Sequence, residues 1–259
     1  MDTINKIFSG FTGFFGEVGT GGTGKEKEVP EITGQPPMQA ADTSSLSEEA
    51  RMLQDEKVSK SSEKKASTPE ERRNSALDSA QNMIASTPGF SGYDATIDSM
   101  RKSGKLSCES GMKNIAQYDS LKDIIQVSTE KGSLDRDFDA EAAKIRSSIL
   151  SPEQKADKLR KLELSKFDRD LLLAGSLVHE GDHKKESVSL NRKKDELKAY
   201  TSEVNFYARQ LEGCKAKEGD SPEVQKEKEA KRNIIKSAIN SAITDARTKE
   251  GVNLGVSVP

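Results

Sequence analysis

Apolar side chains recur at helical spacing along several stretches of this 259-residue chain, and residues that can cap a helix precede them. Thr68, Pro69 and Glu71 combine an N-cap, a first-turn proline and a capping box. We expect this helix to end at about Ala85, before a Pro-Gly pair. A second short helix is expected over 93–102, closed by a glycine.

The same signals recur further along the chain. Ser151 and Pro152 open a charged helix that is expected to end at about Ser165, and an apolar helix is expected from Phe167 to His183. The next helix starts near Ser189 or Asn191 and runs to Leu211, and the last one starts at Ser221. Their apolar stripes are Leu197, Tyr200, Val204, Tyr207 and Leu211, then Ile234, Ile235, Ala238, Ile239, Ala242, Ile243 and Ala246.

Two stretches have the pattern of strands. Residues 123–129 contain a β-branched run that is followed by Lys131 and Gly132, and residues 144–150 alternate in part. Residues 105–120 favour neither state. We therefore expect an α+β fold that is mostly helical, with a small sheet, preceded by a disordered N-terminal segment.

The N-terminal 67 residues differ in composition from the rest. Residues 25–67 are rich in Pro, Ser, Glu and Lys with almost no large apolar residue, which is typical of disorder. Residues 3–15 hold four Phe and two Ile, and we interpret them as a floppy hydrophobic tail. The alternative is weak contact with a membrane surface or a partner. We expect one domain over 68–250 and a mobile tail over 251–259.

A glycine-rich stretch at 19–26 almost matches a phosphate-binding loop, but we reject that interpretation. Glu26 stands where a metal-binding Ser or Thr is needed, its charge would repel phosphate, and no strand precedes the stretch. Net charge is −2 with both signs interspersed, and the chain has no Trp, so we expect no nucleic-acid partner.

Targeting signals and cysteine pairing leave the environment open. The sequence has no stretch typical of a signal peptide or a transmembrane helix, which fits a cytoplasmic protein or one exported without a cleavable signal. Cys108 and Cys214 are either a disulfide or two free thiols. Nothing in the sequence indicates the oligomeric state.

The candidate chemistry lies at the end of the apolar helix, in the motif His179-Glu180-x-x-His183. Histidines four apart on a helix share one face and can bind one metal ion. Glu180, one position on, can reach a water on that metal as its general base. Both histidines of the chain belong to this motif. The alternative is a pair of surface histidines at a helix C-terminus.

A catalytic zinc site needs a third protein ligand, and with no third histidine it must be acidic. Glu196 and Glu203 share the edge of one apolar stripe, but they are about 10 Å apart along the helix, so only one can reach the metal. The other is then a solvated helix residue.

The motif together with Glu196 and Ala199 resembles zincin metallopeptidases of the gluzincin type, over about residues 168–211. In that family the third ligand is a Glu on the helix after the motif helix, commonly followed three positions later by a small residue. This favours Glu196, whereas Glu203 has the spacing from His183 of thermolysin-like members. The resemblance implies a zincin-like fold and a zinc cofactor. It also implies a peptide or protein substrate, attacked by a zinc-held water with Glu180 as general base.

Other residues have possible roles around this site. Tyr200 and Tyr207 are candidate donors to the oxyanion, or else core aromatics. Asp195 could orient a histidine, Asp182 is expected to face solvent, and Gly181 is expected to leave space near the metal.

Three functions remain open at this point. The first is a zinc-dependent metallopeptidase. The second is a non-catalytic helical interaction protein with an incidental or inactive metal motif. The third is a closed structural metal site, against which Glu180 argues because such a site needs no base.

Overall fold

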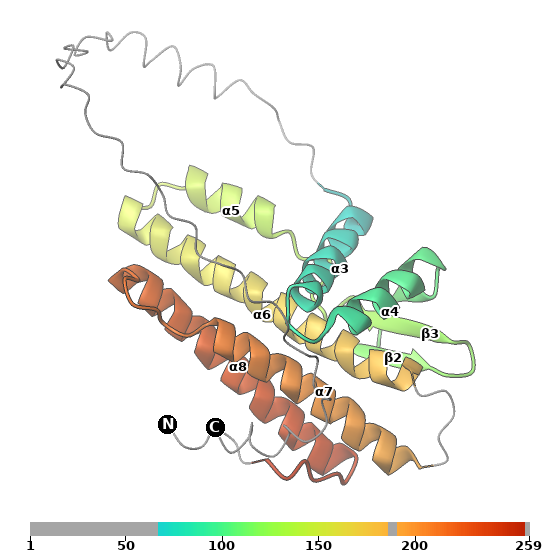
Figure 1. Ribbon diagram of the computed structural model, residues 1–259. Helices are drawn as coiled ribbons and strands as arrows, with labels where there is room; N and C mark the ends of the chain where they lie inside the picture. The colour runs from blue at the N-terminus through green and yellow to red at the C-terminus, as the bar shows by residue number, and fades with distance from the viewer. Residues whose placement is uncertain (1–66, 186–190, 257–259) are drawn as a thin grey trace, which may run out of the picture. The chain divides into compact units, whose positions relative to one another are not determined.

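The computed structural model describes residues 67–185 and 191–256, which all belong to one unit, Ala66–Pro259 (Figure 1). The predicted disorder, the Phe-rich stretch, the glycine-rich stretch and the last part of the predicted tail lie outside the described residues. The described helices and strands are, in order, α3 (Pro69–Ala85), α4 (Ser91–Lys102), β1 (Leu106–Glu109), β2 (Ala116–Asp119), β3 (Ile124–Ser128), α5 (Phe138–Ser147), α6 (Pro152–Lys185), α7 (Arg192–Gly213) and α8 (Pro222–Lys249). The fold is therefore α+β and mostly helical with a small sheet, as predicted.

Three long helices, α6, α7 and α8, lie side by side and pack on one another (Figure 1). The helix α6 also contacts α3, α4, α5 and β2, so it is the element around which the others are arranged. Its C-terminal half is buried over most of its length, from Asp170 to Asp182. The buried residues of this stretch are consequently held by packing on several sides.

The small sheet has the strand order β1-β3-β2. β1 is parallel to β3, with Leu106 opposite Ile125, and β2 is antiparallel to β3, with Tyr118 also opposite Ile125. Ile125 and Val127 on the central strand are fully buried. β2 is an edge strand, and it is the strand that contacts α6.

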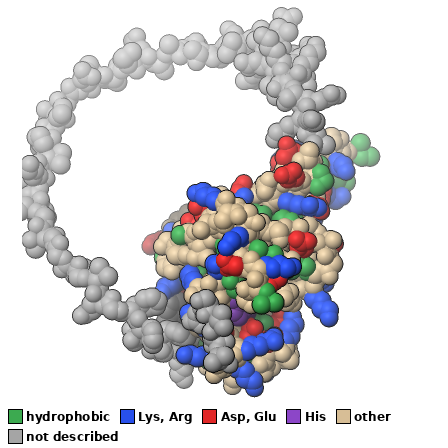
Figure 2. All heavy atoms as spheres, turned by 90° about the vertical axis from the view of Figure 1, so that its right-hand side faces the viewer, with side chains coloured by type: hydrophobic (Ala, Val, Ile, Leu, Met, Phe, Trp, Pro, Cys, Tyr) green, Lys and Arg blue, Asp and Glu red, His purple; other side chains and the backbone are tan. Residues whose placement is uncertain are grey.

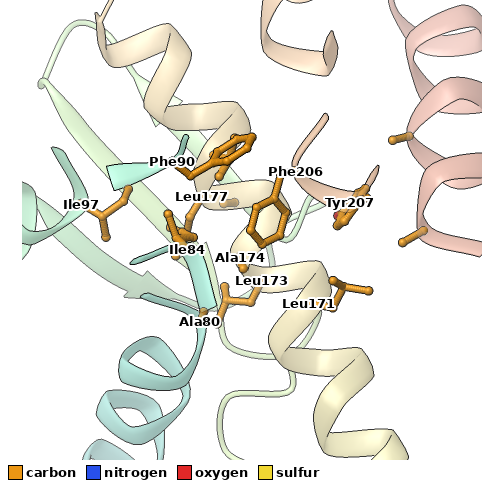
Figure 3. Close-up of a cluster of buried hydrophobic side chains, with 14 of the residues drawn as sticks. Ala80, Ile84, Phe90, Ile97, Leu171, Leu173, Ala174, Leu177, Phe206 and Tyr207 are labelled. Atoms are coloured by element: carbon orange, nitrogen blue, oxygen red, sulfur yellow. The ribbon is translucent and has the colours of Figure 1, made fainter. Parts of the chain in front are cut away.

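The main core lies where α3, α4 and α7 meet α6 (Figure 3). The close-up shows apolar side chains of α6 directed toward those of α3 and α7. Its labelled members are Ala80, Ile84, Phe90, Ile97, Leu171, Leu173, Ala174, Leu177, Phe206 and Tyr207. A second, smaller cluster joins α5 to the N-terminal half of α6 through Phe138, Ala142 and Leu162.

The helix-start signals predicted four helices correctly at their N-termini. The Thr68 hydroxyl accepts from the Glu71 N–H and the Glu71 carboxylate accepts from the Thr68 N–H, which makes the expected capping box. Asn191 caps α7 and Ser221 caps α8. The strand predicted over 123–129 is β3, and the residues left open over 105–120 supply β1 and β2.

The strand predicted at 144–150 is wrong, because Lys144–Ser147 belong to α5. The Asp137 side chain caps this helix by accepting from the Ala140 N–H. Ile145 packs against the α5–α6 cluster. The apolar residue that suggested strand-like alternation therefore lies on the buried face of a helix.

The predicted break between a charged helix and the motif helix is also wrong. α6 is one helix of 34 residues, and Ser165 and Phe167 lie within it. No Pro or Gly lies between Pro152 and Gly175 to end it, and the change from charged to apolar residues marks only where α6 enters the core.

One member of the predicted α7 stripe is wrong as well. Leu197 is 40 % exposed, whereas Ala199 and Phe206 are fully buried. α7 contacts both α6 and α8, so its buried positions occupy more than the single stripe that an amphipathic pattern suggests.

The surface charges and the state of the two cysteines can be compared with the expectations from the sequence. Positive and negative side chains are interspersed on the face shown in Figure 2. Of the alternatives for the two cysteines, the structure has free thiols, since Cys108 and Cys214 are not bonded to each other. Among the described helices, none combines the length and apolar character needed to cross a bilayer.

The close approach of α7 to α6 depends on Gly175. A Cβ atom at this position would lie 2.1 Å from the hydroxyl oxygen of the buried Tyr207. We predict that Gly175→Ala lowers the free energy of unfolding by about 1–3 kcal/mol, as expected for overpacking a core. Urea denaturation measures the loss.

The matched control is Gly213→Ala at the end of α7, where an added Cβ meets nothing within 4 Å. This variant should be as stable as the parent or slightly more stable. An equal loss in both variants would contradict a specific role for the Gly175–Tyr207 contact.

Asp123 ties the sheet to the end of α6. Its carboxylate accepts from the Tyr118 hydroxyl at 2.7 Å and pairs with Lys105 at 2.6 Å and with Lys184. The hydrogen bonds from Lys105, Lys184 and Tyr118 lower the pKa of Asp123. Its φ of 55° lies in the left-handed region, which Asn also tolerates.

We predict that Asp123→Asn destabilises the protein at pH 7, and that the difference from the parent shrinks as pH falls. A depressed folded-state pKa stabilises the fold above the unfolded pKa of about 3.9, and this contribution is lost as pH falls toward the folded pKa. Urea denaturation at pH 7 and pH 3 tests this. Asp98→Asn, which removes an exposed pair with Lys102, should have little effect at either pH. A pH-independent difference for Asp123→Asn would contradict the ion-pair explanation.

Candidate metal centre

His179 and His183 lie on one face of α6, near its C-terminal end, and both face α7. Their Nε2 atoms are 3.2 Å apart. The carboxylate Oε2 of Glu196, in the second turn of α7, lies 3.5 Å from the first of these atoms and 3.6 Å from the second. The structure thus brings together the three residues that the sequence proposed as ligands.

The separations of these three atoms fit a metal ion. Zinc bonds to nitrogen and oxygen are about 2.0–2.2 Å, and ligand atoms at the corners of such a tetrahedron are about 3.4 Å apart. The observed 3.2, 3.5 and 3.6 Å are close to that edge length. Of the His, Cys, Asp and Glu side chains in the described residues, this is the one group of three whose donor atoms converge in this way.

Glu203 occupies a different place from Glu196. Its Oε2 is 3.2 Å from Nδ1 of His179, and its Oε1 accepts a hydrogen bond from the Tyr207 hydroxyl at 3.0 Å. A carboxylate at Nδ1 fixes the proton there and leaves Nε2 of His179 free to bind a metal. The structure therefore places Glu196 with the two Nε2 atoms and Glu203 behind His179. Asp195, suggested from the sequence as the residue that orients a histidine, does not occupy this place.

One face of α7 carries both carboxylates. Glu196, Tyr200, Glu203 and Tyr207 follow one another at spacings of four, three and four, which keeps them on the same side of the helix. The Tyr200 ring packs edge-on against His179 with centroids 4.5 Å apart. The helices α6 and α7 thus contact each other along this face, from the histidines to the close approach of Tyr207 to Gly175.

Charge in the site is balanced between the histidines and these carboxylates. Burial alone would lower the pKa of His179, but Glu196 and Glu203 outweigh it and raise this pKa to about 10. Burial would raise the pKa of Glu196, and its hydrogen bonds to the two histidines hold it at about 2 instead. Glu196 is therefore ionised at neutral pH, as a metal ligand must be.

Glu180 is a buried carboxylate, with 9 % exposure, next to the converging ligands. Burial raises its pKa, while the histidines and a hydrogen bond from the Tyr118 N–H oppose that shift. That N–H belongs to β2 and donates to Oε2 at 2.8 Å. The edge strand thereby fixes the candidate base, which is a contact that no local sequence signal indicates.

The two tyrosines proposed as donors have different surroundings. Tyr207 is 1 % exposed and its hydroxyl donates to Glu203, so it holds that carboxylate in place. Tyr200 is half-buried and lines a cavity of about 210 Å³ together with His179 and Glu180. Burial and neighbouring carboxylates raise the pKa of Tyr200, which keeps its hydroxyl protonated and able to donate.

Two expectations about the motif itself are wrong. Asp182 is buried, with 3 % exposure, and its Oδ1 accepts from the Tyr93 hydroxyl of α4 at 2.9 Å. Gly181 does not leave space for a metal, because the Tyr93 ring fills the space beside it, 3.2 Å from where a Cβ would stand. Contacts between helices that are distant in sequence decide both positions.

Comparison of this chain with models of known protein families, with curated proteins and with solved structures gives no match. The interpretation of the site consequently rests on the geometry described above.

We predict that Glu203→Ala lowers zinc affinity about 10–100-fold, the usual cost of losing the residue that orients a ligand histidine. Glu196→Ala should lower zinc affinity further, since this variant removes a candidate direct ligand. Competition with a chromogenic chelator measures both. Glu212→Ala, on the same helix and paired only with Lys215 among the described ion pairs, is the control and should leave affinity unchanged. A greater loss in Glu203→Ala than in Glu196→Ala would exchange the two roles.

Proposed function

We propose that this protein is a zinc-dependent metallopeptidase with a zincin-like, gluzincin-type centre. The observation that carries the proposal is the convergence of the His179 and His183 Nε2 atoms and a Glu196 carboxylate oxygen at separations of 3.2–3.6 Å. Glu180 is the next residue after His179 on α6, and these two residues line one cavity. In an HExxH motif the two histidines bind zinc and the glutamate acts as the general base.

The proposed ligands are His179, His183 and Glu196, one short of the four that close a structural zinc site. A bound zinc ion would lower the pKa of water and polarise a peptide carbonyl in the remaining position. This favours a catalytic centre over a closed structural one. Metal entry requires His179 to lose the proton that Glu196 and Glu203 stabilise, so binding should strengthen as pH rises.

The chain's own residues supply the remaining steps. Glu180 takes a proton from the attacking water and passes it to the leaving amine. The Tyr118 N–H holds one oxygen of this carboxylate, which leaves the other free for proton transfer. Tyr200, protonated and beside His179, donates to the oxyanion that forms on the carbonyl. Glu203 keeps His179 oriented throughout.

Zinc content and peptide hydrolysis test the proposal together. We expect about one zinc per parent chain by elemental analysis. We also expect cleavage of a proteome-derived peptide mixture, detected by mass spectrometry. Glu180→Gln should keep its zinc and lose about 10²–10⁴-fold in cleavage rate, because it removes a general base and not a ligand. Glu163→Gln, an exposed position on the same helix, is the matched control and should retain activity.

A parent chain without zinc after metal supplementation would overturn the proposal and favour the helical interaction protein. Zinc bound without cleavage would favour an inactive centre. If Glu180→Gln still cleaves peptides at the parent rate, the activity comes from another residue or from a contaminant.

A further inference from the structure

Two cavities lie along α6, and the first contains His179 and Glu180 of the candidate site. The cavity of about 210 Å³ that contains His179 and Glu180 shares three lining residues with a second cavity of about 180 Å³. The shared residues are Ile115, Lys131 and Leu172. The two cavities therefore adjoin there and form one path from the candidate catalytic residues toward α5.

The length of this path suits an extended peptide. Leu172 and His179 are seven residues apart on α6, which corresponds to about 10 Å along the helix axis. An extended chain advances about 3.3 Å per residue. A peptide with its scissile bond at the metal centre would therefore place a residue two or three positions away beside Leu172.

Basic side chains predominate at this distant end of the groove. Lys131, Arg136 and Arg169 line the second cavity, against one carboxylate, Asp168. Lys113 lines the first cavity. Arg136 pairs with Glu141 at 2.9 Å and Arg169 with Asp170 at 2.7 Å. Lys113 and Lys131 are exposed, and neither pairs with an acidic residue in the part of the chain that the structure describes.

Acidic side chains in the rest of the groove already have partners. Asp245 pairs with Lys249 at 2.9 Å and Glu250 with Arg192 at 3.1 Å. Glu203 is bound to His179 and Tyr207. The two unpaired lysines outnumber Asp168, the one carboxylate of the second cavity, whose pKa is raised by burial. A positive charge therefore remains along the groove, which favours an anionic group on the ligand.

We propose that Lys113 and Lys131 select a peptide carboxylate two or three residues from the scissile bond. The carboxylate belongs to an Asp or Glu side chain or to the C-terminus of the substrate. This inference rests on the proposed peptidase function and names the substrate class of the same site. The charge that must be neutralised at the groove end makes acidic peptides better substrates than neutral ones and basic peptides worse.

Peptide hydroxamates test this without requiring turnover, because the hydroxamate binds zinc and fixes the register of the peptide. Two series carry the hydroxamate at the N-terminal or the C-terminal end of a blocked peptide. Each series has Glu, Gln or Lys at the third residue from the hydroxamate. In the N-terminal series, one further Gln peptide has a free C-terminal carboxylate at that distance. Calorimetry with the zinc-loaded full chain gives the dissociation constants.

We expect a carboxylate-bearing member of one series to bind about tenfold tighter than the blocked Gln peptide, and the Lys peptide to bind more weakly. The double variant Lys113→Glu, Lys131→Glu should reverse this order. The matched control, Lys144→Glu with Lys158→Glu, has the same charge change at exposed positions outside both cavities and should keep the parent order. Comparing the Glu peptide with the free-terminus peptide distinguishes a side chain from a C-terminus.

Equal affinities for the Glu, Gln and Lys peptides would overturn the inference and leave the metal centre intact. An order that the Lys113 and Lys131 variant does not change would also overturn it. So would zinc-loaded protein that binds no hydroxamate. Failure to bind zinc is a separate result, read from elemental analysis, and it would overturn the proposed function itself.

Discussion

The contact between α6 and α7 at Gly175 and Tyr207 sets the geometry of the candidate site. With no side chain at 175, the Tyr207 hydroxyl can reach the α6 surface, and a Cβ there would lie 2.1 Å from it. The Tyr207 hydroxyl donates to Glu203, and Glu203 in turn contacts Nδ1 of His179. Glu196, about two turns nearer the start of α7, contacts the Nε2 atoms of both histidines. A shift of α7 by even 1 Å would take the donor atoms away from the separations that suit a metal ion.

The site is also buried at a cost that the surrounding charges offset. Four ionisable side chains, His179, Glu180, Glu196 and Glu203, lie at little exposure around one point. Burying unpaired charges is strongly unfavourable, so such a group persists only when its members are paired or bind a metal. Here the pairing of His179 with Glu196 and Glu203 serves that purpose, and the same pairs hold the candidate ligands in place.

The edge strand β2 connects the sheet to this centre. Its Tyr118 N–H binds Glu180, while its Tyr118 side chain binds Asp123, which pairs with Lys184 on the last turn of α6. One residue of the sheet therefore positions the candidate base and secures the end of the helix that carries the motif. The strand and the loop before it also line the cavity that contains His179 and Glu180, so the sheet and the three long helices form its walls together.

Local rules predicted part of this structure from the order of residues alone. Capping residues located the starts of α3, α7 and α8, and the four-residue spacing of His179 and His183 placed them on one helix face. The resemblance around Glu196 selected the acidic residue that lies with them. The position of Glu203 behind His179 and the burial of Asp182 against Tyr93 follow from tertiary contacts instead. These depend on contacts between segments far apart in the chain, and the spacing of residues within one helix carries no information about which neighbour that helix will meet.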